Sequence, residues 1–234
     1  GGALMILASH QPDFLPYMGF FYKAANCDVL VFSDDVQFSK KGMHNWNRIK
    51  TPGGAQKLTV PVHAHHDTPL KDVMVVDLWH DYDRLAKTIR QHYSRAPYQD
   101  EGEFILTMLG ILAEKKSISL AEMNITINKS LMELFGIDPL IKVASKDLHL
   151  SGHKDERIFH MCDELGADVY LSGTGAASYH QAEEYLLRGI DLAYSDYRPT
   201  EYPQLYGAFV PNLSVLDYVF NCGFKLPTEW EERP

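Results

Sequence analysis

Short apolar runs alternate with longer stretches in which apolar residues recur at helical spacing. Such runs are too short for helices and predict buried strands, at residues 4–9, 28–33, 56–62, 139–144, 168–171 and 192–195. The helical spacing predicts helices between them, at residues 15–25, 82–93, 103–115, 120–135, 151–165, 179–187 and 215–220. The polar and aromatic stretch 34–50 has little periodicity, so a loop with short extended pieces is expected there.

This alternation predicts an α/β fold built on a single Rossmann-like, mostly parallel sheet. We expect one domain over residues 5–223, a helical insertion within it at residues 80–135, and a short acidic tail at residues 224–234. Ligands of such folds bind beyond the carboxyl ends of the strands. Residues that directly follow a predicted strand are therefore the first candidates for a site.

Composition limits the partners. The 234 residues include 22 Lys and Arg against 31 Asp and Glu, a net charge of -9, which argues against nucleic-acid binding. Three cysteines without a CxxC pair are typical of a reducing, cytoplasmic environment. No apolar run approaches the ~20 residues that a membrane span needs. A small-molecule partner is expected, and a homodimer would be the commonest assembly.

Three polar clusters follow predicted strands and would open onto one edge of a parallel sheet: His10-Gln11-Pro12, Ser33-Asp34-Asp35-Val36-Gln37 and Ser172-Gly173-Thr174-Gly175. A neutral imidazole at position 10 could act as a general base or orient a phosphate. The alternative is a histidine that only satisfies local backbone groups. Asp34 or Asp35 could supply a second catalytic group or hold Mg²⁺, or the pair could form a solvated turn. Ser172 and Gly173 could contact a phosphate, or the glycines could serve only a tight turn.

A cationic stretch at residues 39–50 follows the second cluster in this acidic protein and contains Lys40, Lys41, Arg48 and Lys50. It predicts an anion-binding site in which Arg48 makes a planar two-point contact. The alternative is an exposed basic loop. The binding candidates are Gln11, Gln37, Lys40, Asn47, Arg48, Lys50, Ser172 and Gly173.

Other chemistries have little support in the sequence. His63, His65 and His66 are spaced poorly for one tetrahedral metal site and are expected to be solvated. No metal ligand set is therefore predicted. Because no GxSxG motif is present, a Ser-His-Asp hydrolase is not predicted either.

Five ordered motifs are spread over about residues 5–223. They are His10-Gln11-Pro12-Asp13-Phe14-Leu15-Pro16-Tyr17-Met18-Gly19-Phe20-Phe21, Asp34-Asp35-Val36-Gln37-Phe38-Ser39-Lys40, Asn47-Arg48-Ile49-Lys50 with Leu58-Thr59-Val60-Pro61-Val62, Tyr170-Leu171-Ser172-Gly173, and Leu213-Ser214-Val215-Leu216-Asp217 with Phe220-Asn221-Cys222-Gly223. Together they resemble the WbqC-like protein family. The resemblance implies a role in O-antigen or other surface-polysaccharide biosynthesis.

We therefore expect a transferase that moves a group to or from a phosphate-bearing or nucleotide-sugar substrate, with His10, Asp34 and Asp35 as catalytic candidates. The opening motif also resembles, more distantly, the strand–HxGH–helix entry of adenylate-forming nucleotidyltransferases, although the second histidine is missing here. An ATP-dependent ligase or nucleotidyltransferase is thus one alternative. A non-catalytic scaffold protein is the other.

Overall fold

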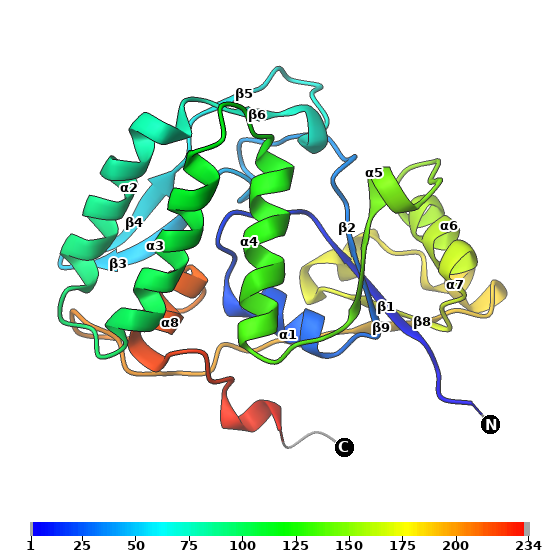
Figure 1. Cartoon of the computed structure of the whole chain (residues 1–234). Helices are drawn as coiled ribbons and strands as arrows, with labels where there is room; N and C mark the ends of the chain where they lie inside the picture. The colour runs from blue at the N-terminus through cyan, green and yellow to red at the C-terminus, as the bar shows by residue number, and fades with distance from the viewer. Residues whose placement is uncertain (1, 232–234) are drawn as a thin grey trace.

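The computed structural model describes residues 2–231 and places five parallel strands in one sheet (Figure 1). The strands are β1 (Ile6–His10), β2 (Val29–Phe32), β7 (Leu140–Val143), β8 (Val169–Ser172) and β9 (Asp191–Tyr194). Their order is β7-β2-β1-β8-β9, and each pairing is parallel. The predicted Rossmann-like α/β fold is confirmed.

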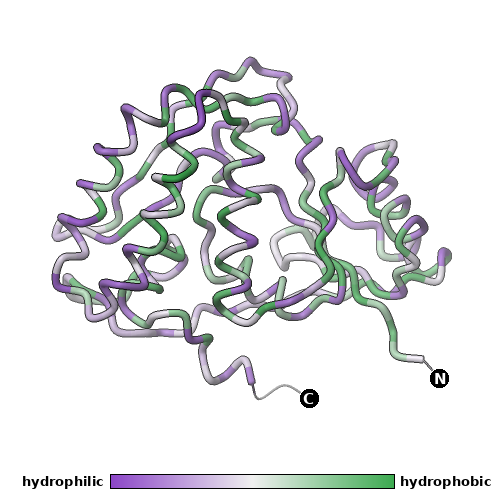
Figure 2. Tube along the Cα trace, in the orientation of Figure 1, coloured by the Kyte–Doolittle hydropathy of each residue, from purple (hydrophilic) through white to green (hydrophobic). Residues whose placement is uncertain are grey.

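Helices cover both faces of the sheet because neighbouring residues of a strand point to opposite sides. Ala8 and Phe32 pack into one apolar core, and Leu7 and Val31 pack into another. The first core also takes residues from α1 (Met18–Ala25), α2 (Leu78–Tyr93), α3 (Gln99–Ala113), α4 (Leu120–Leu134) and α8 (Val215–Cys222). The second takes residues from α5 (Ala144–Asp147), α6 (Asp155–Leu165) and α7 (Ala182–Leu187). Figure 2 shows the hydrophobic residues running along the central strands between the two helical layers.

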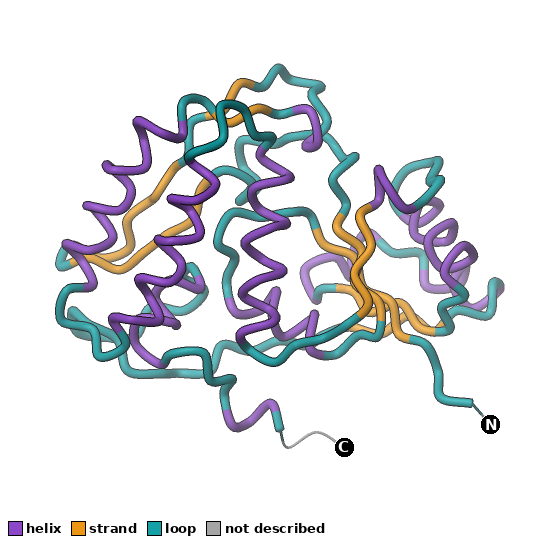
Figure 3. Tube along the Cα trace, viewed as in Figure 1, coloured by secondary structure: helices purple, strands orange, loops and turns teal. Residues whose placement is uncertain are grey.

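The expected loop at residues 34–50 ends in a strand. β3 (Trp46–Thr51) pairs antiparallel with β4 (Gly54–Thr59) in a hairpin apart from the main sheet (Figure 3). Its apolar alternation is hidden because Asn47 and Lys50 are buried polar residues. The strand expected at residues 56–62 is divided near Pro61, which cannot donate to a ladder; β5 (Val62–His63) then pairs with β6 (Met74–Val75).

Short helical turns complete the chain. They are the 3-10 helices η1 (Leu70–Asp72), η2 (Thr174–Tyr179) and η3 (Thr228–Trp230). The helix expected from residue 179 begins only at Ala182, after η2. Of the expected tail, residues 232–234 lie outside the described residues. Among the described helices, none is long and apolar enough to cross a membrane.

The connections between successive strands reverse direction between β1 and β8. From β1 the chain passes through α1 to β2 on one side, and it later enters β8 on the other side through α6. The crevice outside the carboxyl ends of two such strands is where open α/β sheets bind ligands. His10 and Ser172, the last residues of β1 and β8, stand at this crevice.

Candidate active site

A cavity of about 470 Å³ lies at the carboxyl ends of β1 and β8, within the range of small-molecule sites. Four predicted site residues line it: His10, Gln11, Ser172 and Gly173. The cations that line it are Lys23 of α1, Lys154 before α6 and Arg157 within α6. His180 also lines it. The structure therefore brings the first and third predicted clusters together, and Ser33 and Val36 of the second cluster line the same cavity.

His10 is half-buried beside Asp13 and Phe20. Its Nε2 lies 3.0 Å from Asp13 Oδ2, and its ring meets the Phe20 ring edge-on at 4.9 Å. Burial, and next the charge of Lys23, lowers the pKa of His10 below its ordinary value, against the effect of Asp13. The imidazole is therefore neutral at pH 7. With Nε2–H donating to Asp13, Nδ1 is left as the basic atom.

Lys23 supplies a buried cation on the same side of the sheet. Its side chain rises from α1, and Nζ donates to the Ser9 carbonyl at 2.9 Å. Burial lowers the pKa of Lys23 to about 8. An ammonium that is poorly hydrated in this way interacts more strongly with an incoming anion than an exposed lysine does.

Arg157 is held at the cavity by Asp35. Both terminal guanidinium nitrogens donate to the two carboxylate oxygens, Nη1 to Oδ2 at 2.7 Å and Nη2 to Oδ1. The two side chains are only 15% and 24% exposed. Asp35, predicted as a catalytic group, thus fixes the orientation of a cation that sequence reasoning missed. No motif surrounds Arg157 that could have singled it out.

A hydrogen-bonded chain of three side chains reaches the cavity through Ser172. Ser172 Oγ lies 2.7 Å from His180 Nε2, and His180 Nδ1 lies 2.6 Å from Asp155 Oδ1. Burial acts to raise the pKa of Asp155, but hydrogen bonds from the Gln181 N–H, His180 and Tyr185 outweigh it and lower that pKa. Asp155 is the first residue of α6, and His180 lies in the loop between η2 and α7. Both were missed because they carry no recognisable local motif.

Buried asparagines hold the loop between β1 and α1. Asn124 of α4 donates to the carbonyls of Pro12 and His44, each at 2.8 Å. Asn128, one turn later, donates to the Asp13 carbonyl at 3.0 Å.

The third asparagine is Asn47 of β3, whose amide donates to the carbonyls of Phe14 and Leu15. Leu15 takes a φ of 41°, a strained value for a branched side chain that only a well-determined environment maintains. The predicted binding residue Asn47 therefore braces the loop that follows His10.

The remaining predicted residues lie outside the residues that line this cavity. Asp34 is buried and accepts hydrogen bonds from the Ser145 N–H and hydroxyl. Gln37 donates to the His66 carbonyl and to Asp67. Lys40 is exposed, and its carbonyl accepts from the Trp46 indole.

The cations of the hairpin are separated from one another. Arg48 is exposed on β3. Lys50 is only 2% exposed, and its Nζ donates to the carbonyls of Gly207 and Ala208 at 3.2 and 2.6 Å. These side chains do not converge on the cavity that His10 lines.

Comparison with known proteins places the chain in a family. The model of the WbqC-like protein family matches residues 11–228. The chain belongs to the WbqC-like protein family. This WbqC-like chain is 29% identical over 223 residues to the uncharacterized protein Rv1507c of Mycobacterium tuberculosis (strain ATCC 25618 / H37Rv), an alignment that covers 93% of the chain and 94% of that protein. No solved structure matches it.

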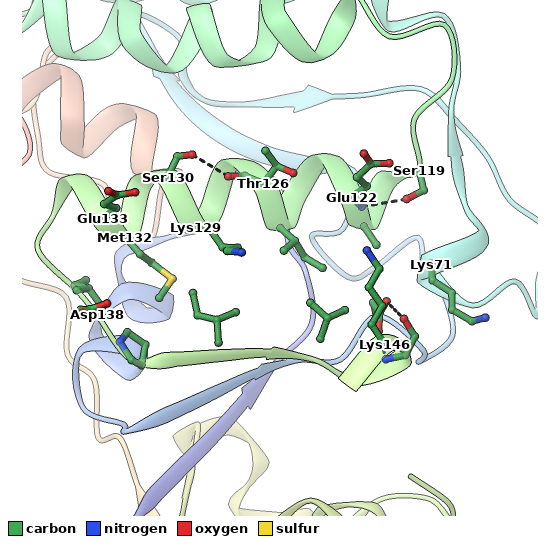
Figure 4. A pocket seen from close by; sticks show the side chains of 18 of the residues that line it. Lys71, Ser119, Glu122, Thr126, Lys129, Ser130, Met132, Glu133, Asp138 and Lys146 are labelled. Atoms are coloured by element: carbon green, nitrogen blue, oxygen red, sulfur yellow. Dashed lines mark hydrogen bonds between the residues drawn. The ribbon is translucent and has the colours of Figure 1, made fainter. Parts of the chain in front are cut away.

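The WbqC-like chain has a second, larger hollow between α4 and β7, of about 1090 Å³ (Figure 4). The charges around it are mixed, with Lys129 and Lys146 near Glu122, Glu133 and Asp138. In the figure, side chains of α4 and of the β7 strand face each other across an open space. Asp34 borders this hollow, but its carboxylate is bound to Ser145. The lysines of this hollow are thus balanced by carboxylates, whereas Lys23, Lys154 and Arg157 line the smaller cavity with one carboxylate, that of Asp13.

The described residues contain no group of three or more His, Cys, Asp or Glu that could hold a metal ion. His63, His65 and His66 are exposed, and His66 pairs with Asp67 at 2.8 Å.

Proposed function

We propose that the chain is an enzyme of surface-polysaccharide or related biosynthesis that transfers a group to or from a phosphate-bearing or nucleotide-sugar substrate. One observation carries this proposal: the cations of Lys23 and Arg157 line the same cavity as the neutral base His10, at the point where the sheet changes direction. The biosynthetic setting comes from the resemblance to the family.

Each residue would have a separate role that follows from its chemistry. Arg157, oriented by Asp35, would make a two-point contact with a phosphate. Lys23 would neutralise a second anionic oxygen, and Nδ1 of His10 would accept a proton from the reacting group. A Cβ added at Gly173 would meet no atom within 4 Å, so the backbone beside Ser172 is open to a ligand.

Magnesium does not fit the two adjacent carboxylates. Asp34 is bound to Ser145 and Asp35 to Arg157, so neither presents a free pair of oxygens to a cation. We propose that any Mg²⁺ requirement arises from the phosphates of the substrate, which commonly carry this ion.

The test is a thermal-shift panel followed by calorimetric titration. The panel contains UDP- and dTDP-sugars, ATP, acetyl-CoA and inorganic phosphate, each with and without Mg²⁺. A ligand at ~100 times its dissociation constant should add about 2.7 kcal/mol to the free energy of unfolding. Arg157→Met should then weaken that ligand by about tenfold or more, because a hydrogen bond to a charged group contributes about 1.5–3 kcal/mol.

A matched control is available on α2. Arg90 also forms a two-point ion pair, in which its Nε and Nη2 donate to Glu103 at 2.8 and 2.9 Å, away from the cavity. Arg90→Met should leave ligand affinity unchanged. A shift with ATP alone would favour the nucleotidyltransferase alternative. The absence of a shift with every compound, or equal affinity in Arg157→Met, would reject the proposal.

A further inference from the structure

We propose that Ser172 is a nucleophile that takes an acyl group from a phosphate-bearing donor and passes it to an acceptor. The inference rests on the proposed function, because the cations at the same cavity select the phosphate of the donor. It goes beyond that function by naming the group transferred and the atom that carries it.

The orientation of the three side chains is that of an activated serine. Ser172 Oγ faces Nε2 of His180, and the carboxylate of Asp155 faces Nδ1 of the same ring. With Nδ1–H donating to the carboxylate, Nε2 has a free lone pair for the hydroxyl proton. The Ser172 hydroxyl also lies 3.3 Å from the Gly173 carbonyl. When its proton turns from that carbonyl to Nε2, His180 can act as the base for Ser172.

Asp155 is held for this role from three directions. The Gln181 N–H donates to Oδ2 at 2.8 Å, and the Tyr185 hydroxyl donates to Oδ1 at 2.9 Å, beside the contact from His180. The side chains of His180 and Asp155 are only 6% and 14% exposed. A fixed, ionised carboxylate both sets the tautomer of the ring and stabilises the imidazolium that forms.

Another serine–histidine pair shows why this geometry is specific. Ser151 contacts His160 through Nδ1, with Ser151 Oγ at 3.0 Å. That is the ring atom which, in His180, faces the carboxylate. The Ser151 pair is also exposed and lies outside the cavity. Ser151 is therefore a suitable control residue for Ser172.

The proposed reaction has two balanced steps. Ser172 Oγ attacks the carbonyl carbon of an activated ester, thioester or acyl phosphate, and its proton passes to His180 Nε2. The bond to the leaving group breaks, and His180 returns the proton to that group, which leaves an acyl-serine. A hydroxyl or amine of the acceptor then loses its proton to His180 and attacks the same carbonyl, and Ser172 regains its proton.

The first experiment treats the full chain with an alkyl fluorophosphonate and follows the covalent adduct by intact-protein mass spectrometry and peptide mapping. We expect the adduct on Ser172 and its loss in Ser172→Ala. His180→Ala should slow labelling by about 100-fold or more, since a positioned general base contributes about 10²–10⁴-fold. Asp155→Asn should also slow it strongly, whereas Ser151→Ala should leave the rate unchanged.

A second variant keeps the test decisive if a substitution perturbs folding. Ser172→Cys should be alkylated by iodoacetamide faster than the native cysteines, because burial raises the pKa of Cys27 and Cys162 to about 12 and of Cys222 to about 11. His180→Ala in that background should remove the advantage. Acetyl-CoA and acetyl phosphate, incubated with the unmodified chain, separate a thioester donor from an acyl phosphate by which one leaves an acetyl group on Ser172.

The outcomes separate the two proposals. No adduct on Ser172 together with slow alkylation of Ser172→Cys would overturn the inference and leave the three side chains with a structural role. The anion-binding function would then still stand if Arg157→Met weakens a phosphate-bearing ligand. Labelling of Ser172 without any ligand-induced shift would instead support the nucleophile and reject the phosphate-bearing donor.

Discussion

Arg157 and Asp35 bring together two segments that lie far apart in the sequence, through a two-point ion pair at the edge of the cavity. Asp35 follows β2, and Arg157 belongs to α6, one of the helices that pack on the face of the sheet formed by Leu7 and Val31. The carboxylate therefore determines where the guanidinium points before any ligand arrives.

Asp35→Asn should weaken a phosphate-bearing ligand by about two- to tenfold, because a released side chain loses about 0.5–1.5 kcal/mol when it is ordered again on binding. The measurement is calorimetric titration of both proteins. Glu103→Gln, in the pair with Arg90, serves as the control. An affinity equal to that of the unmodified chain would show that Arg157 does not depend on Asp35.

Lys23→Met should stabilise the chain at pH 7 and weaken anion binding. The pKa of Lys23 is lowered from its ordinary value of 10.5 to about 8, a difference worth about 3 kcal/mol against the charged form. The charge of Lys23 therefore lowers the free energy of unfolding, and this effect is fully present below pH 8. It disappears as the pH rises from about 8 toward 10.5, because the unfolded chain binds more protons than the folded chain in that range.

The measurement is chemical denaturation of both proteins between pH 7 and pH 9.5. The stability gap between Lys23→Met and the unmodified chain should narrow above pH 8, and other titrations cancel in this difference. Lys129→Met, which removes an exposed lysine, should show no such trend. A stability difference that stays constant with pH would contradict a lowered pKa for Lys23.

Lys50→Met should lower the free energy of unfolding by about 2–4 kcal/mol, because it leaves buried acceptors without their donor. Those acceptors are the carbonyls of Gly207 and Ala208. The charge of Lys50 also opposes the effect of burial on nearby Asp217, whose pKa is raised mainly by burial. Denaturation with urea gives the loss, and Arg48→Met, on the exposed face of the same strand, should change stability by much less. An undiminished stability in Lys50→Met would contradict this structural role.

The sheet and its helices followed from the sequence because strand and helix periodicities differ so clearly. The run from Val29 to Phe32 is buried at every position, as expected for a central parallel strand. The hairpin strand β3 escaped detection because its buried side carries Asn47 and Lys50, which apolar periodicity cannot register.

The site was predictable only where its residues follow strands. His10 and Ser172 were found because the ends of parallel strands meet at one edge. Arg157 and Asp155 belong to α6 and His180 lies in the loop after η2, so their approach depends on how these segments pack. Lys50 is the opposite case. Its charge suggested a ligand site, but tertiary packing places it among backbone carbonyls.

The asparagines that hold the loop after β1 connect the helical layer to the candidate site. Asn124 and Asn128 lie one turn apart on α4, and together they grip the backbone from Pro12 to Asp13, immediately beyond His10. A shift of α4 along its axis would therefore move this backbone and, with it, the position of His10. Substitutions on the outer surface of α4 are expected to change the geometry of the cavity without contacting it.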